Sequence, residues 1–109
     1  MIGVKVISDP DFEASLEYAD GRVWVHNEVS RYSKEVLRRL RIALDALHDI
    51  SGSKELWCLK DLHRMPSAAA RKFRKFVTMM GFEQMPDEYS GDNTKCAAFR
   101  RCKEPDKGV

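Results

Sequence analysis

A long helical stripe, flanked on both sides by strand-like sequence, restricts the folds open to this chain. Apolar residues recur across 33–50 at the spacing of one helix face, at Val36, Leu40, Ala43, Leu44 and Leu47. Ser33 precedes the stripe as an N-cap, and Gly52 follows it as the residue that ends a helix. Residues 22–29 before the helix and 56–59 after it have the apolar patterns of strands. Such a strand–helix–strand unit predicts two parallel strands joined by a right-handed crossover.

Strand signals also stand at both ends of the chain. Alternate apolar residues in 12–18 and the Asp20-Gly21 pair predict an antiparallel hairpin over residues 12–29, because this dipeptide tolerates the positive φ of a two-residue turn. Residues 4–7 form a short opening strand. Near the C-terminus we expect an extended segment over 82–85, a turn over 88–93 and a last strand over 95–102.

A second helical stripe follows the 56–59 strand. Pro66 suits a helix start, and Gly81 closes the segment. Between them apolar residues recur at helical spacing, at Ala69, Phe73, Phe76, Val77 and Met80. The sequence therefore predicts an α/β fold with a mixed, mostly antiparallel sheet and two main helices, in one domain over residues 1–103 with a polar tail over 104–109.

Composition excludes several classes of protein. The 109 residues are 43% hydrophobic and 33% charged, which is typical of a globular chain. No stretch has the roughly 20 apolar residues of a membrane helix, and the N-terminus lacks a secretory pattern, so we expect a cytoplasmic protein away from membranes. Three cysteines without Cys-x-x-Cys spacing predict neither a disulfide framework nor a metal site.

The order of elements resembles the core of the GCN5-related N-acetyltransferase superfamily. In that alignment the 23–29 strand leads through a phosphate-binding turn into the 33–50 helix, and the second helix ends in Gly81-Phe82, as the superfamily's last core helix does. The resemblance covers residues 12–102, with the first strand and helices of a full acetyltransferase absent or reduced. The chain is also similar to truncated acetyltransferase-like accessory and internal virion proteins of tailed phages, which would place it in a host cytoplasm or a virion.

Three positions depart from the superfamily pattern. The cofactor turn reads Arg/Gln-x-x-Gly-x-Gly/Ala in that family, where glycines let backbone N–H groups approach a pyrophosphate. Here the turn is residues 31–36, with Ser33-Lys34 and Val36 in place of the glycines and with Glu35 beside them. Val77 stands where many members carry a tyrosine general acid, and Ala70 stands where an asparagine is common. The resemblance thus implies an acetyltransferase fold with a degenerate acetyl-CoA motif.

Some residues remain candidates for a site. If acetyl-CoA binds, Arg31, Ser33 and Lys34 would hold it. His26 and Glu28 share one face of the 22–29 strand, and together they are the best available candidates for a catalytic general base. Basic residues gather on both helices, and with Arg64, Arg100 and Arg101 they would form an anion or partner patch: Arg38, Arg39, Arg41, Arg71, Lys72, Arg74 and Lys75. A solvated helix face, with Arg41–Asp45 as an i,i+4 pair, is the alternative for the first helix.

Three functions stay open at this point. The first is a non-catalytic binding or structural accessory protein without a cofactor, which meets a protein partner or a second copy of itself. The second is an active N-acetyltransferase with an atypical cofactor turn. The third is a nucleic-acid-binding protein, for which Trp24 and Tyr32 are the available stacking side chains.

Overall fold

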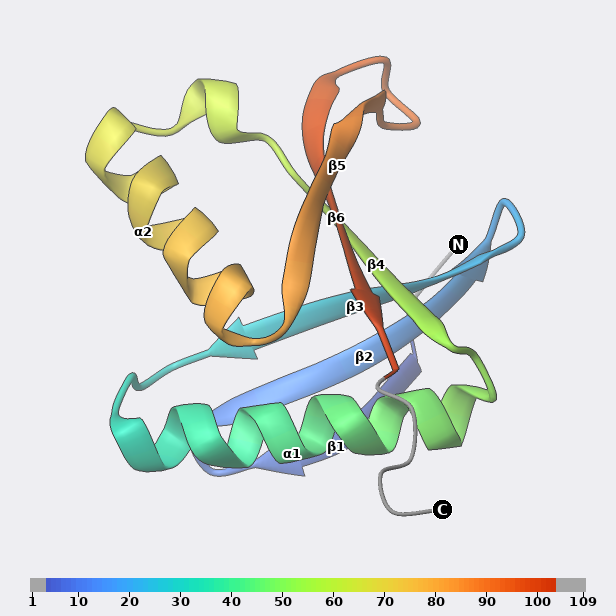
Figure 1. Cartoon of the computed structure of the whole chain (residues 1–109), viewed down its shortest axis with the longest axis vertical. Helices are drawn as coiled ribbons and strands as arrows, with labels where there is room; N and C mark the ends of the chain where they lie inside the picture. The colour runs from blue at the N-terminus through green and yellow to red at the C-terminus, as the bar shows by residue number, and fades with distance from the viewer. Residues whose placement is uncertain (1–3, 104–109) are drawn as a thin grey trace.

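The fold is a six-stranded mixed sheet with two long helices (Figure 1). A computed structural model describes residues 4–103. Along the chain the elements are β1 (Val4–Asp9), β2 (Phe12–Ala19), β3 (Arg22–Val29), α1 (Lys34–Ser51), β4 (Glu55–Lys60), the short 3-10 helix η1 (Leu62–Arg64), α2 (Ser67–Met79), β5 (Phe82–Tyr89) and β6 (Lys95–Cys102). The sheet order is β1-β2-β3-β4-β6-β5. This confirms the predicted fold class; the predicted tail at 104–109 lies outside the described residues.

The N-terminal hairpin is the one predicted from residues 12–29. β2 and β3 pair antiparallel from Phe12↔Val29 to Ala19↔Arg22. Asp20 and Gly21 have φ values of 55° and 73°, as a two-residue turn of this kind requires. The apolar residues of β2 at alternate positions face the core, so the period of two fixed both the register and the buried face.

The first helix begins and ends where its capping residues predict. Ser33 has extended backbone, and its Oγ accepts a hydrogen bond of 3.1 Å from the Val36 amide. Gly52 follows the helix with φ +71°, a conformation that costs glycine little. The predicted stripe from Val36 to Leu47 is buried in the core.

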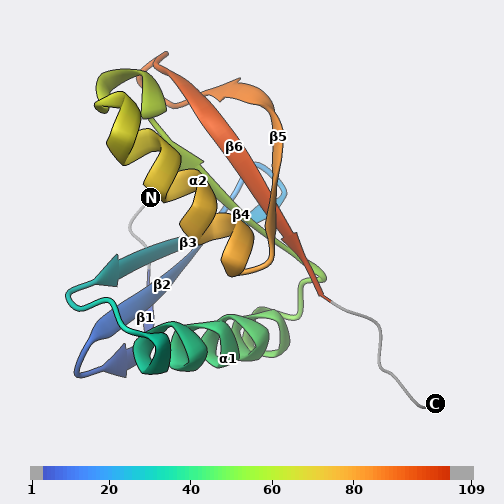
Figure 2. The same ribbon diagram turned by 60° about the vertical axis from the view of Figure 1, so that its left-hand side comes forward.

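Both helices cover the same face of the sheet (Figures 1 and 2). Phe99 and Arg101 lie on one face of β6, since they are two residues apart. Phe73 of α2 packs against Phe99, and Arg101 reaches Asp45 of α1. No described helix covers the opposite face, where Trp24 and Trp57 contact each other.

The last hairpin is longer than the sequence indicated. We predicted an extended segment ending at residue 85 and a turn over 88–93, but β5 continues to Tyr89 and the turn begins at Ser90. The pairing of β5 with β6 shifts register between Met85 and Glu88. Pro86 lies inside this irregularity, and β5 is an edge strand, which is where a sheet tolerates a residue without an N–H.

A buried arginine joins α1, α2 and β6. Arg101 is only 5% exposed; its Nε donates to the Met80 carbonyl and its Nη2 to Asp45, both at 2.7 Å. Gly81 lies directly beside it with φ +95°, and a Cβ on Gly81 would lie 3.2 Å from Arg101 Nε. The glycine that closes α2 is therefore required by both backbone conformation and space.

Replacing Gly81 with alanine should destabilise the fold. The positive φ alone costs an L-residue about 1–2 kcal/mol, and the contact with Arg101 adds to that. Urea unfolding should show this loss for Gly81→Ala. Gly91→Ala, with open space around its Cβ, is the control and should stay within about 0.5 kcal/mol of the parent. Equal stabilities of the two variants would contradict this account of Gly81.

His48 makes the stability of the fold depend on pH. Its side chain is 2% exposed, with Nδ1 3.0 Å from the Ser53 carbonyl and Nε2 buried without a hydrogen-bond partner among the described residues. Burial lowers the pKa of His48 below its usual 6.5. As the pH falls below about 6.5, the unfolded chain therefore takes up a proton that the folded chain refuses, and the free energy of unfolding decreases.

Removing the His48 imidazole should make the free energy of unfolding depend less on pH. Between about pH 7 and pH 5.5, His48→Leu should lose less stability than the parent chain, as measured by urea unfolding at each pH. His63 is exposed, so His63→Asn should keep the parent profile. A parental profile in His48→Leu would show that other groups set the acid response.

Candidate functional site

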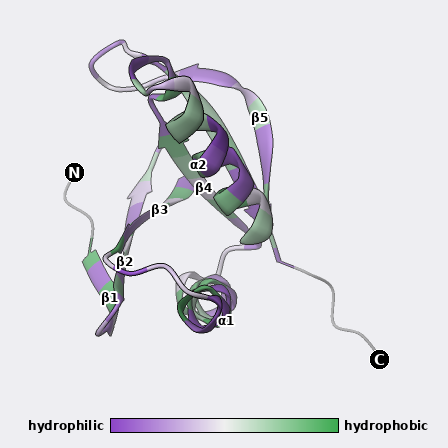
Figure 3. Ribbon diagram, turned by 90° about the vertical axis from the view of Figure 1, so that its left-hand side faces the viewer, coloured by the Kyte–Doolittle hydropathy of each residue, from purple (hydrophilic) through white to green (hydrophobic). Residues whose placement is uncertain are grey.

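The central strands β3 and β4 diverge and leave a cleft between them. They are parallel, and within the described residues their register contains the single pair Trp24↔Trp57. By contrast, β4 pairs with β6 along its whole length, from Glu55↔Cys102 to Lys60↔Ala97. The cleft has a volume of about 400 Å³ and is bounded by residues 25–29 of β3, residues 58–60 of β4 and the inner side of α2. Figure 3 looks down α1 and shows β3 and β4 leaning apart beneath α2.

Asn27 places an unsatisfied polar group in this cleft. It follows Val23 and Val25 on the helix-covered face of β3, since side chains alternate along a strand. Its Oδ1 is buried and accepts no hydrogen bond from the described residues. Such an oxygen is a natural acceptor for a donor on a bound molecule. Sequence reasoning missed Asn27, although one polar residue in a run of inward valines was a usable signal.

Cys58 lines the same cleft, and its surroundings disfavour the thiolate. Its thiol is largely enclosed, and burial raises its pKa to about 12. The reactive form of a cysteine is the thiolate, which is therefore scarce here at neutral pH.

His26, one of the two predicted candidates for a general base, has a different partner from the one expected. His26 and Glu28 do share a strand face, but it is the face that the helices leave uncovered. His26 Nε2 lies 3.2 Å from Glu17 Oε1 on the neighbouring strand, not beside Glu28. Antiparallel pairing of Ser15 with His26 places Glu17 diagonally across from His26 on the same face. The structure therefore corrects the geometry of the pair, and the catalytic role remains a prediction.

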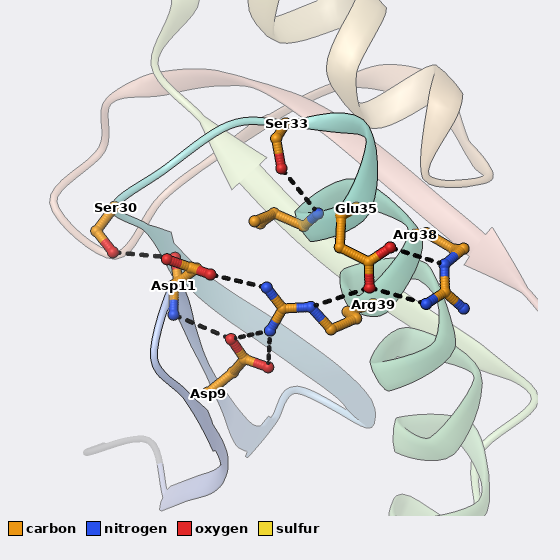
Figure 4. A network of polar contacts seen from close by, with 8 residues as sticks. Asp9, Asp11, Ser30, Ser33, Glu35, Arg38 and Arg39 are labelled. Atoms are coloured by element: carbon orange, nitrogen blue, oxygen red, sulfur yellow. Dashed lines mark hydrogen bonds and ion pairs between the residues drawn. The ribbon is translucent and has the colours of Figure 1, made fainter.

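The turn into α1 is occupied by interactions of the chain itself (Figure 4). The Ser33 hydroxyl caps the Val36 amide, one of the backbone donors that a pyrophosphate at this helix end would use. Arg31 and Lys34, the other two predicted cofactor contacts, are exposed on either side of Ser33. The three predicted residues are thus adjacent, but the hydroxyl among them is already engaged.

Carboxylates neutralise the arginines of the first turns of α1. Arg39 contacts Asp9, Asp11 at 2.7 Å and Glu35 at 3.7 Å, and Arg38 contacts Glu35 at 2.8 Å. Hydrogen bonds from Arg39 and Arg38 hold the pKa values of Asp9 and Glu35 below their usual range, so both acids are ionised at neutral pH. Arg38 and Arg39, predicted as part of an anion or partner patch, thus have carboxylate partners within the fold, and the patch itself stays a prediction.

The remaining basic patch is smaller than predicted. Arg101 is buried against Asp45, Arg100 contacts Glu83 and Glu55, and Arg64 contacts Asp61 at 3.1 Å. Asp45, which the alternative for the first helix gave as an i,i+4 partner of Arg41, is instead paired with Arg101. Among the described residues the exposed cations without an ion pair concentrate on α2, at Arg71, Lys72, Arg74 and Lys75.

The two candidate stacking residues have different environments. Trp24 packs against Trp57 with ring centroids 6.4 Å apart, and the guanidinium of Arg22 lies 3.8 Å from the Trp57 ring. Glu88 fixes that guanidinium through both carboxylate oxygens. Tyr32 is 65% exposed, and its ring meets the edge of Phe76. Tyr32 alone is therefore open to a ligand on the helix side.

Two further searches for sites give negative results within residues 4–103. No three His, Cys, Asp or Glu side chains in that range are grouped so that they could hold a metal ion. Neither of its helices combines the length and hydropathy needed to cross a membrane.

Comparisons with known proteins place the fold among acetyltransferases. No protein-family model matches the sequence, and no curated protein is similar to it. An N-acetyltransferase from Staphylococcus aureus Mu50 superposes with a TM-score of 0.59 at 13% identity, over 85% of this chain and 60% of that one. The aminoglycoside acetyltransferase AAC(6')-Ib, in complex with coenzyme A, superposes with a TM-score of 0.61 at 12% identity, over 87% and 61%.

These similarities confirm the fold that the sequence resemblance implied. The chain has the architecture of the GCN5-related N-acetyltransferases and spans about 60% of the length of each structure it matches. At this level of identity the likeness concerns the fold, and function has to be argued from the cleft and the turn. Neither structure bears on the resemblance to phage accessory proteins, which stays a prediction.

The cysteines offer a direct check of the cleft. Iodoacetamide at pH 8 should modify Cys102, which is exposed, and leave Cys58 unmodified until the chain is unfolded in urea. Peptide mass spectrometry distinguishes the two sites. Equal labelling of Cys58 and Cys102 in the folded chain would mean that the cleft is open to water and that the thiol is active.

Proposed function

We propose that this chain is an acetyltransferase-fold domain that does not catalyse acetyl transfer and acts as a binding or structural accessory module. The observation that carries the proposal is that groups of the chain itself already engage the turn before α1. Ser33 caps the helix there, and the carboxylates of Asp9, Asp11 and Glu35 engage the guanidinium groups of Arg38 and Arg39. A pyrophosphate at this turn would therefore find one backbone donor already used and both of these arginines already compensated.

The chemistry of the cleft supports the same proposal. Val77 occupies the position of the general acid and is 4% exposed, without a group that could protonate a thiolate leaving group. The Cys58 thiol is held in its protonated form. His26 is turned to the uncovered face and engaged by Glu17. Val77 and the protonated Cys58 therefore offer no acid or base to a thioester on the helix side.

An active N-acetyltransferase is the second candidate, and one observation favours it. The cleft between β3 and β4 is preserved, with the unsatisfied Asn27 oxygen inside it. AAC(6')-Ib, which shares this fold, binds coenzyme A. In that case Arg31 and Lys34 would supply the positive charge at the turn, with Glu28 or His26 as base.

A binding module needs a partner surface, and the chain offers two. The edge strand β1 exposes Val4 (65%) and Val6 (36%), so a second copy or another protein can add a strand there. The unpaired cations of α2 suit an acidic partner, a nucleic acid included. We favour a protein partner, because stacking side chains beside these cations are limited to Tyr32.

Isothermal titration with acetyl-CoA tests the proposal. We expect no binding at micromolar concentrations, whereas AAC(6')-Ib, as a positive control, should bind coenzyme A under the same conditions. Micromolar binding by this chain would contradict the degenerate turn. The variants Arg31→Ala and Ser33→Asp would then show whether the cofactor lies at the turn, since both should weaken binding there.

A further inference from the structure

A second hollow adjoins the cleft, between the start of α1 and α2, and shares Tyr32, Lys60, Phe73 and Phe76 with it. Its volume is about 510 Å³, within the roughly 300–1,000 Å³ of sites that hold small molecules. Apolar side chains form its floor: Leu37 of α1, Met65 before α2, and Ala69, Phe73, Phe76 and Met79 of α2. We call this hollow the α2 groove.

The floor of the α2 groove remains partly open to water. Met79 is 45% exposed, and Phe73 and Phe76 are only partly buried. Tyr32 stands at one end of the groove with its ring against the edge of Phe76, at 5.7 Å between centroids. Figure 3 shows apolar and polar colours mixed along α2, as expected for a helix with one side unpartnered. Covering these side chains would therefore release water from apolar surface.

Three lysines surround this apolar floor. Lys60 comes from β4, and Lys72 and Lys75 come from α2. Unlike Arg38 and Arg39 of α1, none of the three forms an ion pair with a described residue. Lys60 Nζ lies 5.4 Å from the Phe73 ring, so its charge is directed over the floor. No carboxylate of residues 4–103 lines the groove, which leaves the positive charge of its rim uncompensated within that range.

We infer that the α2 groove binds a small amphipathic anion, a molecule with one apolar chain and a terminal carboxylate. The apolar floor suits the chain, and the lysine rim suits the anionic group. This inference rests on the proposed function in that it gives the non-catalytic module a ligand. A cationic amphiphile would meet like charge at the rim, and a purely apolar ligand would leave the lysines unused.

Titration with monomeric dodecanoate, followed calorimetrically and by amide chemical shifts, tests the inference. We expect saturable binding with shifts centred on residues 69–79, weakening as salt is raised. Lys72→Glu/Lys75→Glu should weaken the affinity at least about tenfold. Arg71→Glu/Arg74→Glu is the matched control on the same helix, because both residues are exposed outside the groove, and it should change the affinity little.

A substitution that leaves the charge unaltered tests the floor. Ala69→Phe should fill the groove and weaken dodecanoate binding, while circular dichroism shows that α2 remains folded. Dodecyltrimethylammonium should bind at least about tenfold more weakly than dodecanoate. Equal binding of the two amphiphiles, equal effects of the two double variants, or binding to anionic vesicles without binding to the monomer would each overturn the inference.

The two proposals fail in different ways. If neither dodecanoate nor acetyl-CoA binds, the ligand class assigned to the groove is wrong and the non-catalytic proposal stands. If acetyl-CoA binds and displaces dodecanoate, both are wrong, and the groove is the entrance to a cofactor site.

Discussion

The joint between β3 and β4 determines how the rest of this molecule is arranged. These parallel strands meet at Trp24 and Trp57 and then separate, so two antiparallel halves of the sheet are held together by little backbone pairing. Side chains supplement the joint on the uncovered face, where Arg22 lies against the Trp57 ring and is fixed by Glu88 of β5. On the other face, α1, α2 and Arg101 bridge the two halves of the sheet where β3 and β4 separate. The cleft exists because these contacts close one end of the joint and leave the other open.

Charge is distributed differently on the two helices. Arg38 and Arg39 of α1 are compensated by acids from β1, from the β1–β2 turn and from α1 itself, and Arg39 stabilises the position of α1 on the sheet. The cations of α2 have no such partners in the described chain. A helix whose positive charge is unpaired beside an apolar groove is built for contact with something outside the fold. Under the proposed function, the ligand-facing surface of this domain is α2 and not the turn before α1.

The shape of the cleft does not depend on the side chains that would carry out chemistry in it. Divergent strands leave space for a ligand irrespective of the side chains at the turn, since the space comes from backbone geometry. Asn27 offers an acceptor inside. Val77 and the protonated Cys58 supply no acid or nucleophile, and Ser33 occupies the helix end. The fold by itself therefore does not decide the activity.

The sequence by itself determined the elements, because local patterns fix them: the Asp20-Gly21 turn, the Ser33 and Gly52 caps and the α1 stripe all came out as predicted. It did not determine partners. That His26 meets Glu17, that Arg39 meets Asp9 and Asp11, and that Arg101 is buried against Asp45 depended on which strands became neighbours. Such contacts join residues distant along the chain, and no local periodicity encodes them. Only the tertiary structure decided which charges were cancelled, and hence which surface was left to bind.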